Sequence, residues 1–544
     1  MSLPIRRLFV ACLLGLGATA PAAAQSVVAR WIQLGPGSSP AALAAGRYGD
    51  VPLAAAPTIL ARAVVSDGAC PALRLEDGAA VAMRPRFAAA TLADLPVPPH
   101  AAPGYPRGFV QATAPRRFAD GTPMATTAWT ACEAVVPPGH RSATIGGVTL
   151  KLPAAAPRRI VVLGDSGCRM AGEQGEDGAH QQDCHDPAAF PFAAIARAAA
   201  AQHPDLVIHV GDWFYRDTDC RDAFPGCNDP ASPRYETWGD TFDAWNADVL
   251  FPAAPLLAAA PWIMVRGNHE SCGRGARGWF ALLDPHPFDR ARVACTKTRA
   301  YPAASGDAPV YSADFTPSYR VRAGVDFLVN DSSFAHDVTP DAAWAGNDDR
   351  ELTRAVAALD PAVAAVFVTH KPLFGLERPG RGGVAAPVGN ASQQAVFGGG
   401  TFAGSAFAQG VPRGIGLFLA GHIHQFELVA PRDRARFAPQ LVLGIGGTQL
   451  DHDLTTGTIP RAGAGGPGFA QTDMRFDLHR LAGRVAVVAR AYARDDFGFA
   501  VLDAVTDAAG RVTGFTARIV RLGAGVAGTC HITLTPERDA DCDF

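Results

Sequence analysis

The sequence RRIVVLGD at residues 158–165 is an apolar run that ends in a glycine and a carboxylate. A second run of the same kind, DLVIHVGD, occupies residues 205–212. The alanine-rich segment 187–203 between them has helical spacing. A strand, a helix and a second strand predict a right-handed parallel unit, so the fold should be built around a parallel sheet.

Further apolar runs follow and extend this pattern toward the C-terminus. They lie at residues 262–266, 325–330, 364–369, 417–420 and 441–445, and residues 348–360 have the spacing of a helix. Together they predict a large layered α/β core. The glycine-rich segment 373–415 lacks strong periodicity, and we predict a long lid or binding loop there. From about residue 466 the chain looks mostly extended.

The N-terminal residues carry the pattern of a secretory signal. Arg6 and Arg7 precede a short apolar run, 8–16, and small residues end at Ala24. This pattern predicts cleavage after Ala24, because the run is too short to span a bilayer as a membrane anchor. A formal net charge of -3 gives no indication of binding to nucleic acid or to an anionic membrane. We therefore predict a periplasmic or secreted protein.

The cysteines agree with export. Without Cys12, an even number remains, in neighbouring pairs. Pairing in sequence order, which the sequence alone does not settle, gives Cys70 with Cys132, Cys168 with Cys184, Cys220 with Cys227, Cys272 with Cys295, and Cys530 with Cys542. Metal ligation is the alternative, but no Cys-x-x-Cys spacing occurs, which favours disulfides in an oxidising compartment.

Side chains that can bind metals follow the predicted strands. They are Asp165, Asp212, Asn268, His370, His422 and His424. Ligands of α/β sheets bind beyond the carboxyl ends of strands, where loops distant in sequence converge. A single such residue is usually a cap or a hydrogen-bonded core residue, but five strand ends of this kind favour a metal site. Carboxylates, an amide and imidazoles suit Fe, Mn or Zn.

Five motifs resemble those of the calcineurin-like metallophosphoesterase superfamily and, within it, the purple acid phosphatases. They are GDSG at 164–167, GDWFY at 211–215, GNHE at 267–270, FVTH at 367–370 and GHIH at 421–424. One departure is Phe367, where the family has valine, and this residue should simply pack within its strand. The resemblance covers residues 158 to about 450.

The resemblance implies a layered β-sandwich flanked by helices and preceded by a small all-β, fibronectin-III-like domain. Residues 25–155, with short apolar stretches between proline- and glycine-rich turns, would form that N-terminal β-sandwich. The implied division is then a signal peptide at 1–24, the sandwich at 25–155, the catalytic domain at 156–465, and a β-rich extension at 466–544 that completes it.

Tyr215 distinguishes the subfamily. Most metallophosphoesterases have a metal-binding histidine at the position of Gly167, and that ligand is missing here. By resemblance to the purple enzymes, Tyr215 replaces it as a phenolate that holds Fe(III). The alternative is that Tyr215 is an ordinary aromatic residue in the cluster WFY at 213–215.

The resemblance also assigns the ligands of two metal ions. The first ion, Fe(III), would use Asp165, Asp212, Tyr215 and His424. The second, a divalent Fe, Zn or Mn ion, would use Asp212, Asn268, His370 and His422. A metal-bound water that loses its proton near neutral pH would then attack phosphorus.

Other residues of the motifs would contact the substrate. His269 is expected to steady a phosphoryl oxygen and to protonate the leaving alcohol. Glu270 either orients His269 or is a solvated acid. Arg169 and Arg274 follow two of the motifs, and we predict that they contact phosphate.

The function that follows is an exported, acid phosphatase-like hydrolase of phosphate monoesters. One alternative is a Mn- or Zn-dependent phosphodiesterase or nucleotidase of the same superfamily. An alternative of another class is a binding protein that kept the fold and lost turnover. The expected partner is a small phosphorylated substrate, and the sequence does not predict an oligomeric state.

Overall fold

The computed structural model describes residues 27–66, 68–90, 127–170, 182–216, 236–272, 274–291, 293, 312–377, 386–451 and 468–543. The predicted signal segment, residues 1–24, lies outside them. None of the helices in these ranges combines the length and the apolar character that a membrane crossing requires.

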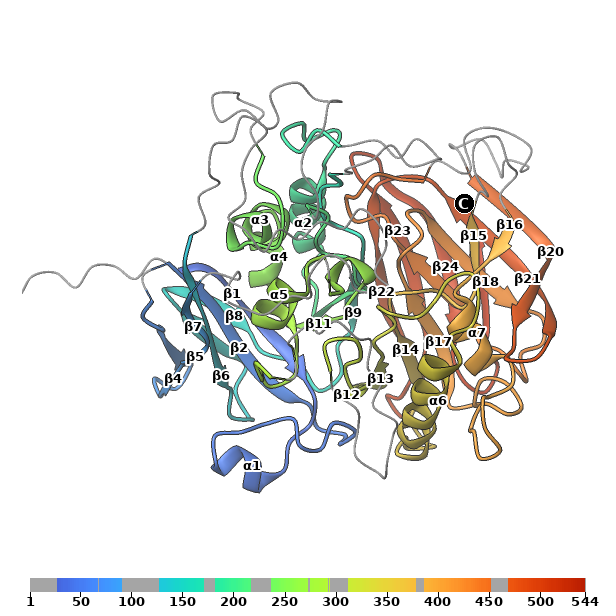
Figure 1. The fold of residues 1–544 in the computed structure, drawn as a ribbon, viewed down its shortest axis with the longest axis horizontal. Helices are drawn as coiled ribbons and strands as arrows, with labels where there is room; N and C mark the ends of the chain where they lie inside the picture. Colours follow the sequence, from blue (N-terminus) through green and yellow to red (C-terminus); the bar gives the residue numbers. More distant parts are fainter. Residues whose placement is uncertain are drawn as a thin grey trace, which may run out of the picture.

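Two large sheets form the centre of the molecule (Figure 1). The first has eleven strands, in the order β25 (Asp539–Asp543), β24 (Gly525–Thr533), β23 (Val512–Arg521), β22 (Gly498–Thr506), β9 (Arg159–Leu163), β10 (Leu206–His209), β11 (Trp262–Met264), β1 (Val27–Gly35), β2 (Thr58–Val65), β6 (Trp129–Val135) and β5 (Arg84–Ala90). The second has eight, in the order β12 (Tyr319–Ala323), β13 (Val325–Val329), β14 (Ala365–Val368), β17 (Ile415–Ala420), β19 (Gln440–Leu443), β18 (Phe426–Pro431), β21 (Arg484–Arg494) and β20 (Gly468–His479).

The two sheets pack face to face, and helices cover their outer faces. Alternate residues of β9 point to opposite sides, so that Ile160 and Val162 join the core between the sheets while Val161 and Leu163 face the helical layer. The helical segments beside the first sheet are α2 (Phe192–Ala200), α3 (Phe242–Trp245), η2 (Asn246–Leu250), α4 (Ala254–Ala259), α5 (Ala276–Gly278) and η4 (Trp279–Leu283). Those beside the second are α6 (Ala342–Ala357) and α7 (Ala391–Phe397). The predicted β-sandwich flanked by helices is thus confirmed.

Several neighbouring strands in each sheet run parallel, so their carboxyl ends, and the polar residues that follow them, lie at the same edge of the sheet. β9 pairs with β10 in parallel, as the strand–helix–strand pattern predicted, and β10 pairs with β11 in the same way. In the second sheet β13, β14, β17 and β19 are also parallel neighbours. Phe367 in β14 is buried and packs against Phe397 of α7 and Phe418 of β17, with ring centroids 5.1 and 5.0 Å away.

The N-terminal region is almost entirely β-structure. A separate four-stranded sheet shares an apolar core with β1, β2 and β6. Its strands, in order, are β4 (Ala80–Ala82), β3 (Ala72–Leu75), β7 (Ser142–Ile145) and β8 (Val148–Lys151). The region also contains a short helix, α1 (Pro40–Ala44). Its larger sheet is continuous with the central one, because β1 runs parallel to β11 with Gln33 opposite Trp262.

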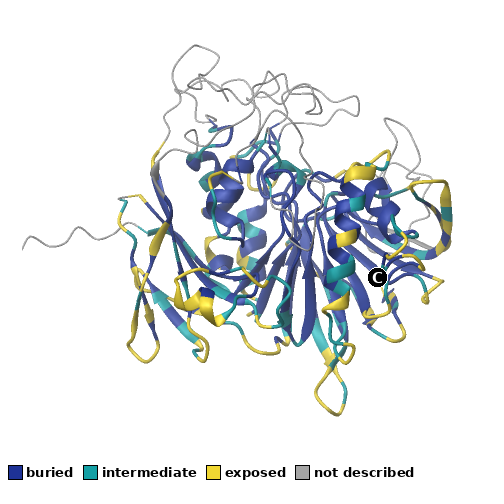
Figure 2. Cartoon of the chain, turned by 60° about the horizontal axis from the view of Figure 1, so that its bottom comes forward, coloured by how far each residue is buried: buried dark blue, intermediate teal, exposed yellow. Residues whose placement is uncertain are grey.

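The C-terminal strands complete both central sheets. β20 and β21 form an edge of the eight-stranded sheet, where β21 pairs with β18. β22 crosses to the other sheet and pairs with β9 in antiparallel register, followed by β23, β24 and β25. Figure 2 shows that the central strands are buried and that exposed positions gather in peripheral turns.

Three of the five predicted disulfide pairs lie wholly within the described residues, and all three are bonded. Cys70–Cys132, Cys168–Cys184 and Cys530–Cys542 are bonded, with Cα atoms 5.6, 5.8 and 4.0 Å apart. Cys272 is also disulfide-bonded. Its expected partner Cys295, together with Cys220 and Cys227, lies outside the described residues.

Two sequence expectations need correction. The predicted helix at 348–360 is α6, which begins earlier because the Asp341 side chain caps it and accepts hydrogen bonds from Ala343 N and Trp344 N. The predicted long loop at 373–415 contains β15 (Gly375–Glu377), β16 (Ala386–Val388) and α7. All of α7 is buried, so it shows no alternation of polar and apolar faces in the sequence.

Candidate metal centre

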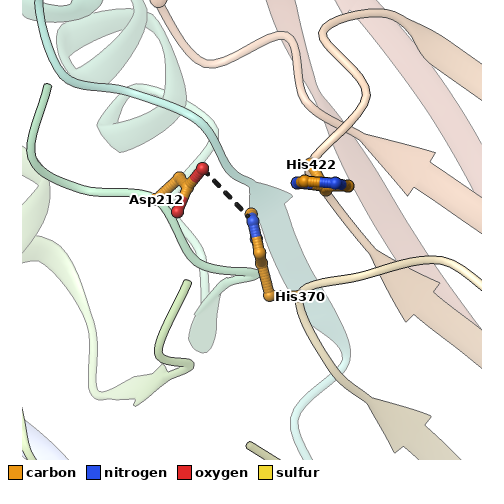
Figure 3. Close-up of side chains that lie close together, drawn as sticks. All are labelled: Asp212, His370 and His422. Carbon is orange, nitrogen blue, oxygen red and sulfur yellow. Dashed lines mark ion pairs between the residues drawn. The ribbon is translucent and has the colours of Figure 1, made fainter. Parts of the chain in front are cut away.

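The predicted ligands meet where the parallel strands of both sheets end. Figure 3 shows Asp212, His370 and His422 pointing toward one another from three separate loops. One possible ligand atom from each lies within 4.8 Å of the others. Asp165 and Asn268 follow β9 and β11, and His424 follows β17. The short helix η3 (Asn268–Glu270) carries Asn268 and His269.

Local backbone conformation brings these side chains into the site. Asp165, Asp212 and His422 have positive φ angles of 56°, 54° and 74°. Such angles are rare for residues other than glycine and often mark functional positions. Glycines allow the close approach: a Cβ atom at Gly211 would lie 2.5 Å from His370 Nδ1, and one at Gly267 would lie 2.1 Å from Asp212 Oδ1.

Asp212 and His370 form the buried centre of the site. Asp212 Oδ2 lies 3.2 Å from His370 Nε2 (Figure 3). Burial opposes ionisation of Asp212, but the positive charges of His370 and His269 outweigh it and hold the pKa of Asp212 well below its usual value. Burial likewise disfavours the imidazolium, yet Asp212 raises the pKa of His370 to about 9. His370 Nε2 is also 3.0 Å from Asn268 Oδ1.

Backbone carbonyls determine which nitrogen of two histidines faces the site. His370 Nδ1 donates to Val210 O at 2.9 Å, and His424 Nδ1 donates to Gln449 O at 2.8 Å. A carbonyl can only accept, so in the neutral imidazole, which is the form that binds a metal, each Nε2 keeps a lone pair that points into the site. This is the arrangement that metal-binding histidines require.

Tyr215 lies among the ligand atoms of the first predicted metal. Its hydroxyl oxygen is 3.1 Å from Asp165 Oδ1, 2.9 Å from Asp212 Oδ2 and 2.9 Å from His424 Nε2. Burial, together with both carboxylates, raises the pKa of the Tyr215 phenol well above its ordinary value. A neutral phenol has one proton to donate, but three acceptor atoms face it. A cation among these four atoms would relieve that mismatch, so the donor set fits a metal ion.

Gly167 explains why no histidine stands in the first motif. A Cβ atom at this position would lie 2.7 Å from both Trp213 O and Tyr215 N, which leaves no space for a side chain. The two motifs therefore pack backbone against backbone at this point.

Asp248, which sequence reasoning missed, holds the first two motifs together. It lies in η2, is fully buried, and its Oδ2 accepts from Tyr215 N at 2.9 Å. Its Oδ1 accepts from Cys168 N at 3.2 Å and from Arg216 Nε at 2.5 Å. Burial raises the pKa of Asp248 to about 6, although Arg216 opposes the shift. Asp248 is far from the motifs in sequence, and no local pattern identifies it.

Glu270 is a buried anchor for the backbone of the second motif, and the interpretation of it as a solvated acid was wrong. Its carboxylate accepts from the backbone N–H groups of Asp212, Trp213, Phe214 and Gly267 at 2.8–3.1 Å. Burial, with the negative charge of Asp212, raises the pKa of Glu270 to about 8. Glu270 therefore fixes the backbone of the second motif relative to the third.

Asp337 is a second carboxylate that sequence reasoning missed. Its Oδ1 lies 3.4 Å from His422 Nε2, and its Oδ2 lies 2.8 Å from Lys371 Nζ. Asn390 Nδ2 donates to Oδ1 at 2.8 Å. With Nε2 directed at Asp337, His422 can present its Nδ1 lone pair to a metal.

The residues predicted to contact substrate lie at different depths around the site. The His269 N–H donates to Asp212 Oδ1 at 2.8 Å, and its ring lies on that of Tyr215, with centroids 3.8 Å apart. The charge of Arg169 acts on both Tyr215 and His424. Arg274 is half-buried in the turn between η3 and α5, where its N–H donates to Ser271 O. The roles of these three residues remain predictions.

Comparisons with known proteins bear on the same region. The family model of the calcineurin-like phosphoesterases matches residues 158–426. A solved purple acid phosphatase from yellow lupin (Lupinus luteus) seeds is 13% identical, aligns over 94% of this chain and 74% of its own, and has a TM-score of 0.46. The solved structure of PhoD is 8% identical, with 96% and 94% covered and a TM-score of 0.44. No curated protein sequence matches the chain.

Proposed function

The chain carries a calcineurin-like phosphoesterase domain over residues 158–426, and from this premise we propose that it is an exported phosphatase with two metals, acting on phosphate monoesters. Members of this family bind two metal ions and hydrolyse phosphoesters. The finer assignment to a purple acid phosphatase-like enzyme with Fe(III) and a divalent ion is part of the proposal.

The observation that carries the proposal is the position of the Tyr215 hydroxyl. It lies within 3.1 Å of one atom each of Asp165, Asp212 and His424. Fe(III) is a hard cation that favours anionic oxygen, and two carboxylates with a phenolate supply it. The proposed first set is Asp165, Asp212, Tyr215 and His424, and the proposed second set is Asp212, Asn268, His370 and His422.

The bound metals would supply Lewis-acid activation of water and of the phosphoryl oxygens. The protein orients their ligands through Glu270, Asp248 and the carbonyls of Val210 and Gln449. His269 is held at the rim by its N–H bond to Asp212 and by the Tyr215 ring. From there its imidazole would protonate the departing alcohol oxygen. Arg169 would contact a phosphoryl oxygen.

Tyr215→Phe tests the assignment. The purified wild-type protein should contain iron and absorb visible light through phenolate-to-iron charge transfer. The variant should lose that absorption, because the phenolate oxygen is gone. Tyr319→Phe is the matched control: Tyr319 is buried, lies outside the ligand set, and its loss should leave the spectrum unchanged.

The same preparations separate the alternatives. We expect monoesters to be hydrolysed faster than diesters in a panel that shares one leaving group. A colourless, iron-free protein that is fully active with Mn or Zn would overturn the iron assignment. A preference for diesters would favour the phosphodiesterase alternative instead. The proposal of export is supported by the disulfides Cys70–Cys132, Cys168–Cys184 and Cys530–Cys542.

A further inference from the structure

A cavity of about 570 Å³ adjoins the metal centre, and His422 forms part of its wall. This volume lies in the range of small-molecule pockets, roughly 300–1,000 Å³. The side chain of His422 is 25% exposed, whereas that of His370 is fully buried, so the ligand set meets this cavity at His422. A phosphoester bound at the metals could therefore place its alcohol in this cavity.

Much of the cavity wall is apolar. It includes Pro372, Pro387, Val388 and Ile423, and Val338 stands at its margin with 81% of its surface exposed. An exposed valine beside a buried polar centre gives an organic group an apolar surface to cover. The wall suits an aromatic or aliphatic body better than it suits a strongly hydrated one.

Hydrogen bonds hold the wall in place. Gln394 of α7 donates through Nε2 to Leu373 O at 3.0 Å and accepts at Oε1 from His479 N, also at 3.0 Å. Arg480 Nε donates to Gly398 O at 2.8 Å. These bonds tie the β20–β21 hairpin to α7 beside β16 (Figure 1), so the cavity is already formed without a ligand.

The hairpin contributes a cation to the cavity. Arg484 lies opposite His479 across β20 and β21, and its Nη1 donates to the backbone carbonyl of Asp477 at 3.3 Å. Among the described residues it pairs with no carboxylate. The Asp477 carboxylate is already engaged, with Oδ1 2.9 Å from Arg475 Nη2. Asp337 is likewise neutralised by Lys371.

We propose that this cavity binds the leaving alcohol and that Arg484 selects phosphate monoesters whose alcohol carries a second acidic group. The inference rests on the proposed phosphatase function and adds a substrate class to it. Such a substrate has an apolar body for the wall and a carboxylate or second phosphate for Arg484. Arg484 is a specificity residue, since it lies in the hairpin and contributes nothing to the metal ligands.

The test compares phenyl phosphate with 4-carboxyphenyl phosphate. For each protein the ratio of kcat/KM for the carboxylated ester to that for the plain ester is measured, so that intrinsic reactivity cancels between variants. Arg484→Gln should lower this ratio about tenfold, a modest effect because the pair is partly solvated. Arg484→Glu should lower it further and should improve the ratio for 4-(aminomethyl)phenyl phosphate.

Arg511→Gln is the matched control, because Arg511 is an exposed arginine of another hairpin, paired with Asp507. It should keep the wild-type ratio. An unchanged ratio in both Arg484 variants would overturn the pocket assignment while leaving the phosphatase function intact. If neither ester is hydrolysed, the proposed function fails. Calorimetric binding of the two matching aryl phosphonates then tests Arg484 independently, and equal affinities in wild type and Arg484→Gln would reject its role.

Discussion

Asp337 shows how one residue outside the motifs can control a ligand within them. Its carboxylate lies between His422 Nε2 and Lys371 Nζ. Carboxylates that support a metal-binding histidine typically account for ten- to a hundredfold in metal affinity. We expect Asp337→Asn to lower the affinity for the divalent metal that His422 would bind by about tenfold, as measured by competition with a chromogenic chelator.

The control for this prediction is Asp360→Asn, which removes an exposed carboxylate paired with Arg322. It should retain wild-type metal affinity. Equal metal affinities in Asp337→Asn and wild type would mean that Asp337 pairs with Lys371 but does not support His422 as a metal ligand. The exposure of Asp337, 47% for its side chain, makes loss of folding an unsuitable explanation for weaker binding.

At the scale of single residues, the sequence predicted the positions that follow strands and missed those that support them. Asp165 and His370 each stand two residues beyond the last residue of a strand, and the apolar runs in the sequence reveal where those strands end. Asp248 and Asp337 lie in irregular segments and act on motif residues that are distant in sequence, Tyr215 for one and His422 for the other. Only the folded chain shows these partnerships.

At the scale of elements, α6 carries a buried acid, Glu351, whose effect on the free energy of unfolding depends on pH. Glu351 accepts a hydrogen bond from Ser318 N, and burial raises its pKa from 4.5 to about 7. The protonated form is thus favoured in the folded state. The stabilisation that this shift gives the folded state is fully present below pH 4.5 and is lost as the pH rises through 7. The free energy of unfolding therefore falls by about 3 kcal/mol over this range.

Glu351→Gln should remove this dependence. Relative to wild type, the variant should be more stable at pH 8 than at pH 5, as measured by urea unfolding at both values. Glu537→Gln, at an exposed position, should follow the wild-type curve. If the difference between Glu351→Gln and wild type is the same at both pH values, Glu351 is ionised throughout and the argument fails.

Elements that the sequence predicted well are those with clear alternation or short apolar runs, such as β9, β10 and β14. The helix α7 was missed because it is buried on all sides and follows a glycine-rich segment. Its start depends on Asn390, whose side chain accepts from Gln393 N at 2.9 Å. A capping residue alone, without amphipathic spacing, is a weak signal in a sequence.

At the scale of the whole molecule, the eleven-stranded sheet takes strands from the predicted N-terminal sandwich, the catalytic domain and the C-terminal extension. Arg62 in β2 donates to Leu282 O and Asp284 O at 3.2 and 3.1 Å, and it pairs with Glu133 at 3.2 Å. It therefore links the N-terminal strands to the catalytic region. Arg62→Ala should lower the unfolding free energy by about 1–3 kcal/mol, because it leaves the buried Leu282 carbonyl without this donor, whereas Glu133 and Asp284 O keep Arg86 as a partner.

Calorimetry should show one cooperative transition in both wild type and Arg62→Ala, shifted to lower temperature in the variant. Arg74→Ala, an exposed change in β3, should leave the transition in place. Two separated transitions in wild type would show that the N-terminal strands unfold independently, despite the pairing of β1 with β11.

The pairing of β22 with β9 has a consequence for biosynthesis. The edge of β9, residues 159–163, receives its partner only when residues 498–506 have been made. Until then a hydrophobic strand presents unpaired backbone groups, and contacts so distant in sequence form slowly. We expect the nascent chain to remain incompletely folded and dependent on chaperones until its last strands emerge, a state that suits threading through a translocation channel.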